Sequence, residues 1–266
     1  MSKVKYFRDE SIPFFELKSC DNAVHSSKKH AHIELSIGIV LKGTSIVECE
    51  RESFIVSRGM MICIPPDVVH QCCPHDTKNW SFHMMYLKKN WIESSFEADL
   101  QKLPTFAKFL NSKDFSRINA LCSFMQLESL SGIEKESFLL SELNYFLDLD
   151  AYLNENTRGL HDDKQTMKLI NNFLNDNYLE KITLDDLCRI SGLSKYYLIR
   201  AFENSYRLSP HAYLTMLRIN HAKKELRKNR QITDVAMEAG FYDQSHFVKV
   251  FRQYSGTTPI KYLKGG

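Results

Sequence analysis

The sequence lacks any apolar run near the roughly 18 residues that span a bilayer, and residues 1–10 contain no apolar signal-peptide core. It also lacks a Cys-x-x-Cys pair, and its seven cysteines are scattered. An odd and scattered set argues against a disulfide framework or a zinc module. With 43% hydrophobic and 25% charged residues, we expect a soluble globular protein of a reducing cytoplasm, without a membrane partner.

The small net charge of +3 hides two parts of opposite sign. Residues 164–266 contain 17 Lys and Arg against 9 Asp and Glu, a net charge of +8. Residues 1–163 contain 18 Lys and Arg against 23 Asp and Glu, a net charge of −5. A basic part joined to an acidic part suggests a polyanion-binding module with a separate partner domain, although many basic surfaces are only solvated faces.

Residues from about 14 to 88 have the pattern of β structure. Short apolar stretches are separated there by Gly and Pro turn signals, which predicts a sandwich or barrel of short strands. From residue 103 to 156, apolar residues recur every third or fourth position, which predicts amphipathic helices. The polar segment 157–164 has no periodic apolar face and is predicted to link domain 1–156 to domain 165–266.

The C-terminal domain is predicted to be entirely helical and contains an internal near-repeat at an offset of 48 to 49 residues. The first copy consists of Leu184, Leu187, Cys188, Gly192, Leu193, Leu198 and Phe202. The second copy consists of Ile232, Val235, Ala236, Gly240, Phe241, Phe247 and Phe251. Each copy has a small residue where two helices would cross and a glycine where the turn needs a positive φ. We therefore predict helix-turn-helix units at about 184–205 and 232–255.

Helix-start residues support these boundaries. Thr183 with Asp186 forms a capping-box pattern before the first unit, whereas Gln231 is a poorer cap before the second. Ser209-Pro210 begins a connecting helix of about 20 residues, so roughly 30 Å. That length approximates the roughly 34 Å between successive major-groove faces on one side of B-DNA. A rigid connector could therefore place two recognition helices in adjacent grooves.

Both predicted recognition helices are expected to expose side chains suited to DNA. Arginine can read guanine edges and glutamine can read adenine, whereas Lys195 and Arg252 are better placed for phosphates. The predicted DNA-contact residues are Lys195, Tyr196, Ile199, Arg200, Gln244, Ser245, His246, Lys249 and Arg252.

A set of spaced residues in the C-terminal part forms a recognisable signature: Ser209 and Pro210, then Arg218 and Ala222, then Ile232, Val235, Ala236, Gly240, Phe241, Ser245, Phe247 and Phe251, and finally Gly256, Thr258 and Pro259. Through them residues 165–264 resemble the AraC/XylS family of bacterial transcription regulators. The resemblance implies a bacterial regulator, expected to be an activator, with double-stranded DNA, a second copy of the chain and RNA polymerase as partners. Ile199 departs from the family, which commonly has a polar reader there, so it is expected only to touch a thymine methyl.

The N-terminal part has a looser resemblance. Residues 29–34 (KHAHIE) look like the first cupin motif, and residues 59–70 (GMMICIPPDVVH) resemble the second. Many regulators of this family carry such a barrel as a sensory domain. The expected fold class is therefore α+β with two domains: an N-terminal cupin-like β-barrel with following helices, and an all-α double helix-turn-helix domain.

Three histidines and one glutamate of the cupin-like motifs allow two interpretations of the barrel, with a bound metal ion or without one. Imidazole and carboxylate groups could bind iron, manganese or zinc, and alternate residues of a strand share a face. The alternative, which we expect, is a barrel that holds no metal and no other cofactor, because the outer-shell partners of the ligands cannot be seen in a sequence. These weak metal candidates are His30, His32, Glu34 and His70.

A barrel of this shape is expected to hold a small-molecule effector. The predicted pocket residues are Phe14, His30, His32, Glu34, His70, Phe82, Met84 and Tyr86, each of which could instead belong to the core. The predicted homodimer contacts are Leu139, Leu143, Phe146 and Leu153, although a helix stripe packs more often on its own domain.

Three functions remain open on sequence grounds. The one we expect is a transcription regulator without enzymatic activity, in which the effector biases an equilibrium between two states. The alternative is a metal-dependent cupin enzyme fused to a nucleic-acid-binding module. A DNA-binding structural protein without sequence preference is a third, which the varied side chains at the reading positions argue against.

Overall fold

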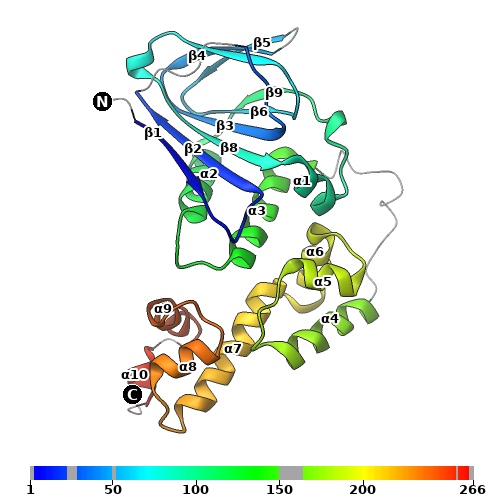
Figure 1. The fold of residues 1–266 in the computed structure, drawn as a ribbon, viewed down its shortest axis with the longest axis vertical. Coiled ribbons are helices and arrows are strands. Elements are labelled where there is room, and N and C mark those ends of the chain that lie inside the picture. The colour runs from blue at the N-terminus through cyan, green and yellow to red at the C-terminus, as the bar shows by residue number, and fades with distance from the viewer. Residues whose placement is uncertain (1–2, 23–28, 50–51, 150–163, 256, 264–266) are drawn as a thin grey trace. The chain divides into compact units, whose positions relative to one another are not determined.

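The computed structural model describes residues 3–22, 29–49, 52–149, 164–255 and 257–263 (Figure 1). These residues form two compact units. The first contains the described residues up to 126 together with 138–149, and the second contains 127–137 together with the residues from 164 onward. The predicted linker lies outside the described residues except for Lys164, which begins a helix.

The first unit is built on two antiparallel sheets. The larger has the strand order β1-β2-β8-β3-β6-β9 and the smaller has the order β5-β4-β7. The strands are β1 Lys3–Arg8, β2 Phe15–Asp21, β3 Glu34–Lys42, β4 Thr44–Cys49, β5 Glu52–Ser57, β6 Met60–Ile64, β7 His70–Pro74, β8 Ser81–Lys88 and β9 Phe106–Phe109. The predicted β structure is confirmed, and β1 extends it toward the N-terminus.

Both faces of the larger sheet are apolar, because each is covered. On β8, Phe82, Met84 and Tyr86 lie in the core between the sheets. On β6, Ile62 joins that core, whereas the neighbouring Met61 is fully buried on the opposite face. Figure 1 shows helices α2 and α3 on that opposite side. A strand buried on both faces has a continuous apolar sequence, as residues 60–64 have.

Among the described residues, three α-helices accompany the sheets. They are α1 Lys89–Phe96, α2 Ser112–Met125 and α3 Gly132–Leu147, with the 3-10 turns η1 Thr77–Asn79 and η2 Leu100–Lys102. Arg117 of α2 holds Glu142 of α3 with two hydrogen bonds, of 2.6 Å from Nε and 2.9 Å from Nη2. The helices predicted within 103–156 are confirmed over α2 and α3. The prediction is wrong over residues 106–109, because these pair with β6 as an edge strand.

The apolar residues of α3 stabilise their own unit. Leu139, Leu143 and Phe146 are 0%, 2% and 5% exposed. They therefore offer no surface to a second chain in this structure, contrary to the dimer contacts predicted for them. Leu153, the fourth predicted contact, lies outside the described residues.

The C-terminal part of the second unit is entirely helical among its described residues. The helices are α4 Lys164–Asn177, α5 Leu184–Ser191, α6 Lys195–Tyr206, α7 Pro210–Leu226, α8 Ile232–Glu238, α9 Gln244–Ser255 and α10 Pro259–Leu263. Helices α5 and α6 form the first predicted helix-turn-helix unit, and α8 and α9 form the second. This confirms the predicted fold class, a sheet-rich domain joined to a helical domain.

The turn and cap residues behave as their chemistry dictates. Gly192 and Gly240 have φ values of +71° and +74°, a region that residues with a Cβ rarely adopt. Thr183 and Asp186 form a reciprocal capping box at the start of α5. Gln231 makes no side-chain cap bond before α8. The local rules for helix starts and tight turns therefore fix the limits of both units.

The connecting helix α7 starts as predicted but is shorter. Ser209 caps it by accepting a hydrogen bond from the Ala212 amide at 3.2 Å, and Pro210 occupies its first position. Its 17 residues span about 25 Å. Arg218, in its middle, donates hydrogen bonds to the carbonyl oxygens of Tyr178 at 2.8 Å and Glu180 at 2.9 Å. The connector is thus fastened to the segment that follows α4.

Candidate DNA interface and effector pocket

One face of α9 is exposed and polar. Ser245, Lys249 and Arg252 lie four and three residues apart, a spacing that places them on the same side of a helix. They line a hollow of about 500 Å³ together with Val248, Gln253 and Thr258. Gln244, at the start of the helix, is also exposed. Two cations beside an amide and a hydroxyl provide the donors that contact phosphates and base edges.

The corresponding face of α6 is only partly exposed. Arg200 is exposed, as predicted, and donates a hydrogen bond from Nη1 to the Tyr196 hydroxyl at 3.1 Å. Its guanidinium carbon lies 5.3 Å from the centroid of the Tyr196 ring. Tyr196 and Ile199 are each 6% exposed, so the exposure predicted for them is wrong. The apolar Ile199 gains from leaving water, and Tyr196 retains a polar partner in Arg200.

Lys195 and His246 are also buried rather than exposed, at 8% each. Lys195 Nζ lies 2.6 Å from Glu136 Oε1 and 3.0 Å from Asp185 Oδ1. Burial opposes the charge of Lys195, but the two carboxylates together raise its pKa. His246 Nε2 lies 3.8 Å from Glu134 Oε1. Because Glu134 and Glu136 are far away in the sequence, inspection of the recognition helices could not reveal these partners.

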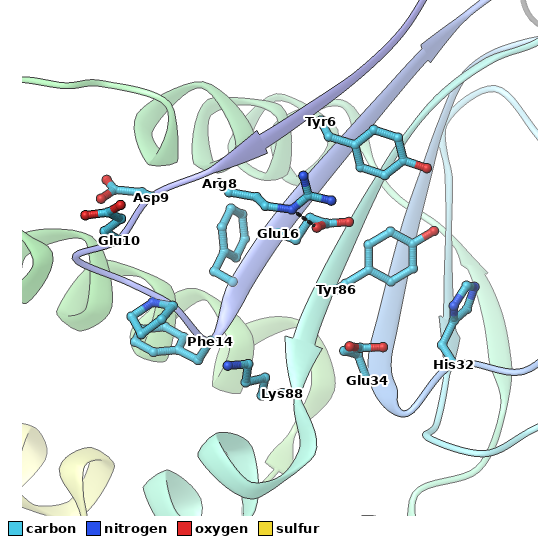
Figure 2. Close-up of a pocket in the computed structure, with 12 residues that line it drawn as sticks. Tyr6, Arg8, Asp9, Glu10, Phe14, Glu16, His32, Glu34, Tyr86 and Lys88 are labelled. Carbon is cyan, nitrogen blue, oxygen red and sulfur yellow. Dashed lines mark hydrogen bonds and ion pairs between the residues drawn. The ribbon is translucent and has the colours of Figure 1, made fainter.

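A pocket of about 480 Å³ opens at the strands of the larger sheet (Figure 2). Four predicted pocket residues line it: Phe14, His32, Glu34 and Tyr86. The other lining residues were not predicted and are Tyr6, Arg8, Asp9, Glu10, Pro13, Phe15, Glu16 and Lys88. Most of them belong to β1 or the turn after it, where the sequence was not assigned to a strand. The alternation of two lysines with Val4 and Tyr6 over residues 3–6 was the available signal.

The lining combines aromatic rings with charges of both signs. The β1–β2 register sets Arg8 opposite Glu16, and Figure 2 shows the two side chains paired. Phe14 stacks on Trp91 with their ring centroids 4.1 Å apart. Burial, the largest cause, raises the pKa of the Tyr86 hydroxyl. The hydroxyl therefore stays protonated and can donate a hydrogen bond to a bound molecule.

Two predicted pocket residues belong to the core instead. Phe82 and Met84 line a cavity of about 20 Å³ between the sheets, among Val40, Val47 and Ile62. That volume holds one water at most. Phe82, Met84 and Tyr86 share one face of β8 toward the core between the sheets, and of the three it is Tyr86, near the end of the strand, that lines the pocket.

His30, His32 and His70 come together beside the pocket. One ring nitrogen from each lies within 4.8 Å of the others. The ring centroids are 4.8 Å apart for His30 and His32, 4.5 Å for His30 and His70, and 5.2 Å for His32 and His70. Burial, and after it unfavourable electrostatic interaction with His70, His30 and Lys18, lowers the pKa of His32 to about 4. Glu34, the fourth metal candidate, lines the pocket and is not part of this cluster.

The cysteines form no disulfide among the described residues. All seven are free thiols. Cys72 is buried, and burial raises the pKa of its thiol to about 12, which opposes formation of the thiolate.

None of the helices in the described ranges has the length and apolarity needed to cross a membrane.

Two family descriptions match the chain. An AraC-like ligand binding domain matches residues 15–143, and a helix-turn-helix domain matches residues 187–265. The first match covers strands β2 to β9 with α1, α2 and most of α3. The second begins within α5 and covers the rest of both helix-turn-helix units. The chain therefore combines a ligand-binding domain with a DNA-binding domain.

Similar proteins are transcription regulators. An uncharacterized HTH-type regulator of Bacillus subtilis, YbfI, is 28% identical over 82% of this chain and 80% of its own length. The raffinose operon regulator RafR of Pediococcus pentosaceus is 37% identical over 35% of this chain and 34% of its own length. The chain thus spans most of the first relative and about a third of the second.

A structure of ToxT from Vibrio cholerae covers 94% of this chain and 97% of its own, with 13% identity and a TM-score of 0.39. At that TM-score the likeness adds nothing to the fold described above. The two domain matches and the relatives of the full chain agree with the resemblance of residues 165–264. The chain belongs to the AraC family of transcription regulators.

Proposed function

We propose that the chain reads a specific double-stranded DNA sequence through α9 and α6, and that a small molecule in the pocket of Figure 2 controls this binding. The observation that carries the proposal is the exposed face of α9. Gln244, Ser245, Lys249 and Arg252 are all accessible on it without any rearrangement. Amide and hydroxyl groups provide base readout, and the two cations provide phosphate contacts.

Helix α6 can contact DNA fully only if some of its side chains leave their buried positions. Arg200 is accessible and is the base reader that we assign to this helix. Lys195, Tyr196, Ile199 and His246 must leave their buried positions before they can contact DNA. For Lys195 this means that a phosphate replaces the carboxylate of Glu136, which now accepts its hydrogen bond. DNA binding therefore competes with an ion pair that already exists.

The pocket suggests the chemical class of the effector. Asp9, Glu10, Glu16 and Glu34 outnumber the cations Arg8 and Lys88. An acidic pocket with aromatic walls favours a polar molecule that is neutral or positively charged and carries hydroxyl or amino groups. Such groups can donate to the carboxylates while the rings cover apolar faces.

The wider role follows from the family. We propose an activator, as the name of the relative AdaA of Bacillus subtilis, a bifunctional transcriptional activator and DNA repair enzyme, suggests. We propose a homodimer through exposed side chains, contacts with RNA polymerase, and action in the bacterial cytoplasm, where the chromosome lies. No catalytic step is assigned to the chain.

In-vitro selection from random double-stranded DNA, using the full chain, tests the DNA proposal. The selected sequence and a scrambled version are then compared by fluorescence anisotropy at two salt concentrations. We expect tighter binding to the selected sequence at both. Equal affinity for the two duplexes would instead identify a protein that binds DNA without sequence preference.

A thermal-shift screen of neutral and cationic polar metabolites on the full chain tests the pocket. Glu34→Gln and Tyr86→Phe are expected to remove the shift given by the best compound, while His75→Ala, an exposed residue away from the pocket, keeps it. A shift that survives both pocket substitutions would place the effector elsewhere.

A further inference from the structure

We propose that His30, His32 and His70 bind one divalent transition-metal ion of the zinc, cobalt or nickel type. The proposal rests on the cluster itself and does not depend on DNA binding or on the effector proposed above. Among the described residues, these three histidines form the group of three or more potential metal ligands whose ligand atoms lie close together.

The backbone holds the three residues in place. His30 and His70 form a β-bridge, with reciprocal amide-to-carbonyl hydrogen bonds of 3.0 Å and 2.8 Å. The amide of Asp67 donates to the carbonyl oxygen of His32 at 2.7 Å. Two separate segments of the chain, one on each side of the cluster, are thus fastened together at two points. The side chains need no folding step to meet, which lowers the entropy cost of binding an ion.

His70 has the orientation expected of a metal ligand. Its Nδ1 lies 2.9 Å from the carbonyl oxygen of Val68. A carbonyl can only accept, so Nδ1 carries the proton and Nε2 keeps its lone pair. Metal-binding histidines commonly donate their second ring nitrogen to a backbone carbonyl in this way.

The distances between the rings require only a small contraction. An ion about 2.0–2.1 Å from each nitrogen in tetrahedral geometry holds the nitrogens about 3.4 Å apart. The ring nitrogens now lie within 4.8 Å of one another. Side-chain rotations that move each ring by about 1 Å bring them to the separation that the ion requires. Three neutral imidazoles favour zinc, cobalt or nickel over the harder magnesium and calcium ions, which prefer oxygen.

Three protein ligands leave a coordination position for another molecule. His32 lines the effector pocket, and its ring centroid lies 4.9 Å from that of Tyr86. Water, or a hydroxyl or amino group of a pocket ligand, can complete the coordination. The ion would then take part in ligand binding.

The positive charge of Lys18 acts on the histidine cluster and opposes the binding of a cation there. Lys18 is buried on β2, with Nζ 5.9 Å from the centroid of the Phe82 ring, and its charge acts on His32. A fixed cation weakens the binding of a second cation. Replacing it by an apolar side chain of similar length, in Lys18→Met, is therefore expected to increase the metal affinity.

Cobalt titration of the full chain, purified with a chelator and then freed of it, tests the site. We expect a visible d–d absorption band that saturates at one ion per chain, and zinc that displaces the cobalt. His32→Ala and His70→Ala should each weaken binding by about tenfold or more, while His75→Ala, on an exposed surface, should leave it unchanged. Circular dichroism shows whether each variant is folded.

Several results would overturn the proposal. They are the absence of a cobalt band, binding that both histidine variants retain, or an intense sulfur-to-cobalt band that identifies cysteine ligands. If the histidine variants do not fold, the cobalt affinity of the Lys18→Met chain tests the proposal instead. A cobalt affinity that does not rise in this variant contradicts the assigned position of the ion. None of these measurements uses DNA, so failure of the metal site leaves the proposed DNA recognition intact.

Discussion

Arg218 Nη1 donates a hydrogen bond to the carbonyl oxygen of Gly240 at 3.2 Å, so the connecting helix holds the turn of the second helix-turn-helix unit directly. The same guanidinium binds the carbonyl oxygens of Tyr178 and Glu180. One side chain therefore joins the segment after α4 to the turn between α8 and α9. The arginine of the family motif has a structural role here, because it satisfies three backbone acceptors.

The two turn glycines are expected to respond differently to alanine. A Cβ at Gly240 would lie 2.9 Å from Arg218 Cζ, whereas a Cβ at Gly192 would meet nothing within 4 Å. Both substitutions introduce the strain of a positive φ, about 1–2 kcal/mol. Gly240→Ala should cost about 1 kcal/mol more, because Arg218 must move away from its acceptors. Urea unfolding of the two variants measures the difference, and equal losses would contradict the role of Arg218.

The cap residues provide a second matched pair. Thr183→Ala removes a capping box and is expected to lower the free energy of unfolding by about 1 kcal/mol. Ser194→Ala should have little effect, because the Ser194 hydroxyl makes no hydrogen bond within the described residues. Thermal denaturation followed by circular dichroism compares them. A larger loss for Ser194→Ala would show that its hydroxyl has a partner in solution.

The loss of a base contact should depend on the DNA sequence, whereas the loss of a phosphate contact should not. Arg200→Ala is expected to cost about 1–3 kcal/mol on the selected DNA and little on scrambled DNA. Arg252→Ala should weaken both duplexes alike and reduce the slope of affinity against salt by about one. Anisotropy titrations over a salt series give both quantities. Identical behaviour of the two variants would contradict the assigned roles.

Glu136 is expected to oppose DNA binding. Glu136→Gln removes the carboxylate 2.6 Å from Lys195 Nζ and keeps that of Asp185 at 3.0 Å. The affinity for the selected DNA should rise by about 1.5 kcal/mol, the lower end for a hydrogen bond to a charged group, because Lys195 no longer has to leave a buried carboxylate. Glu128→Gln, an exposed residue of the same segment, is the control. If both substitutions change the affinity equally, only the net charge matters.

Acid should destabilise the first unit through His83. Burial lowers the pKa of His83 below its ordinary value of 6.5. Between the two pKa values the unfolded chain binds more protons than the folded chain, so the free energy of unfolding falls as the pH drops below 6.5. His32 and His70 shift in the same direction. His83→Asn should therefore reduce the slope of stability between about pH 7 and pH 5 without abolishing it, as urea titrations can show. An unchanged slope would mean that His83 is accessible to water.

The sequence was most informative where the physics is local. Positive φ at Gly192 and Gly240, the capping box at Thr183 and the proline at the start of α7 depend only on neighbouring residues. These features located both helix-turn-helix units. The inner strands β3, β6 and β8 are buried on both faces, so they were visible as short apolar stretches between Gly and Pro turn signals.

What the sequence could not show depends on distant partners. Strands β1 and β9 lie at the two edges of the larger sheet, where burial is weakest and the pattern is short. Missing β1 and the turn after it meant missing five of the twelve pocket residues, including Arg8. The burial of Lys195 depends on a carboxylate 59 residues away. No rule of local spacing indicates which of several acidic residues will reach it.

The short, continuous α7 has a consequence for the target DNA. A flexible tether would let the second reading helix search several positions, with a gradual loss of effective concentration. A helix that begins with a proline and is fastened by Arg218 allows no such search. Inserting one base pair between the two contacted grooves shifts the second by about 3.4 Å and rotates it by about a tenth of a turn. Operator spacing is therefore expected to matter as much as operator sequence.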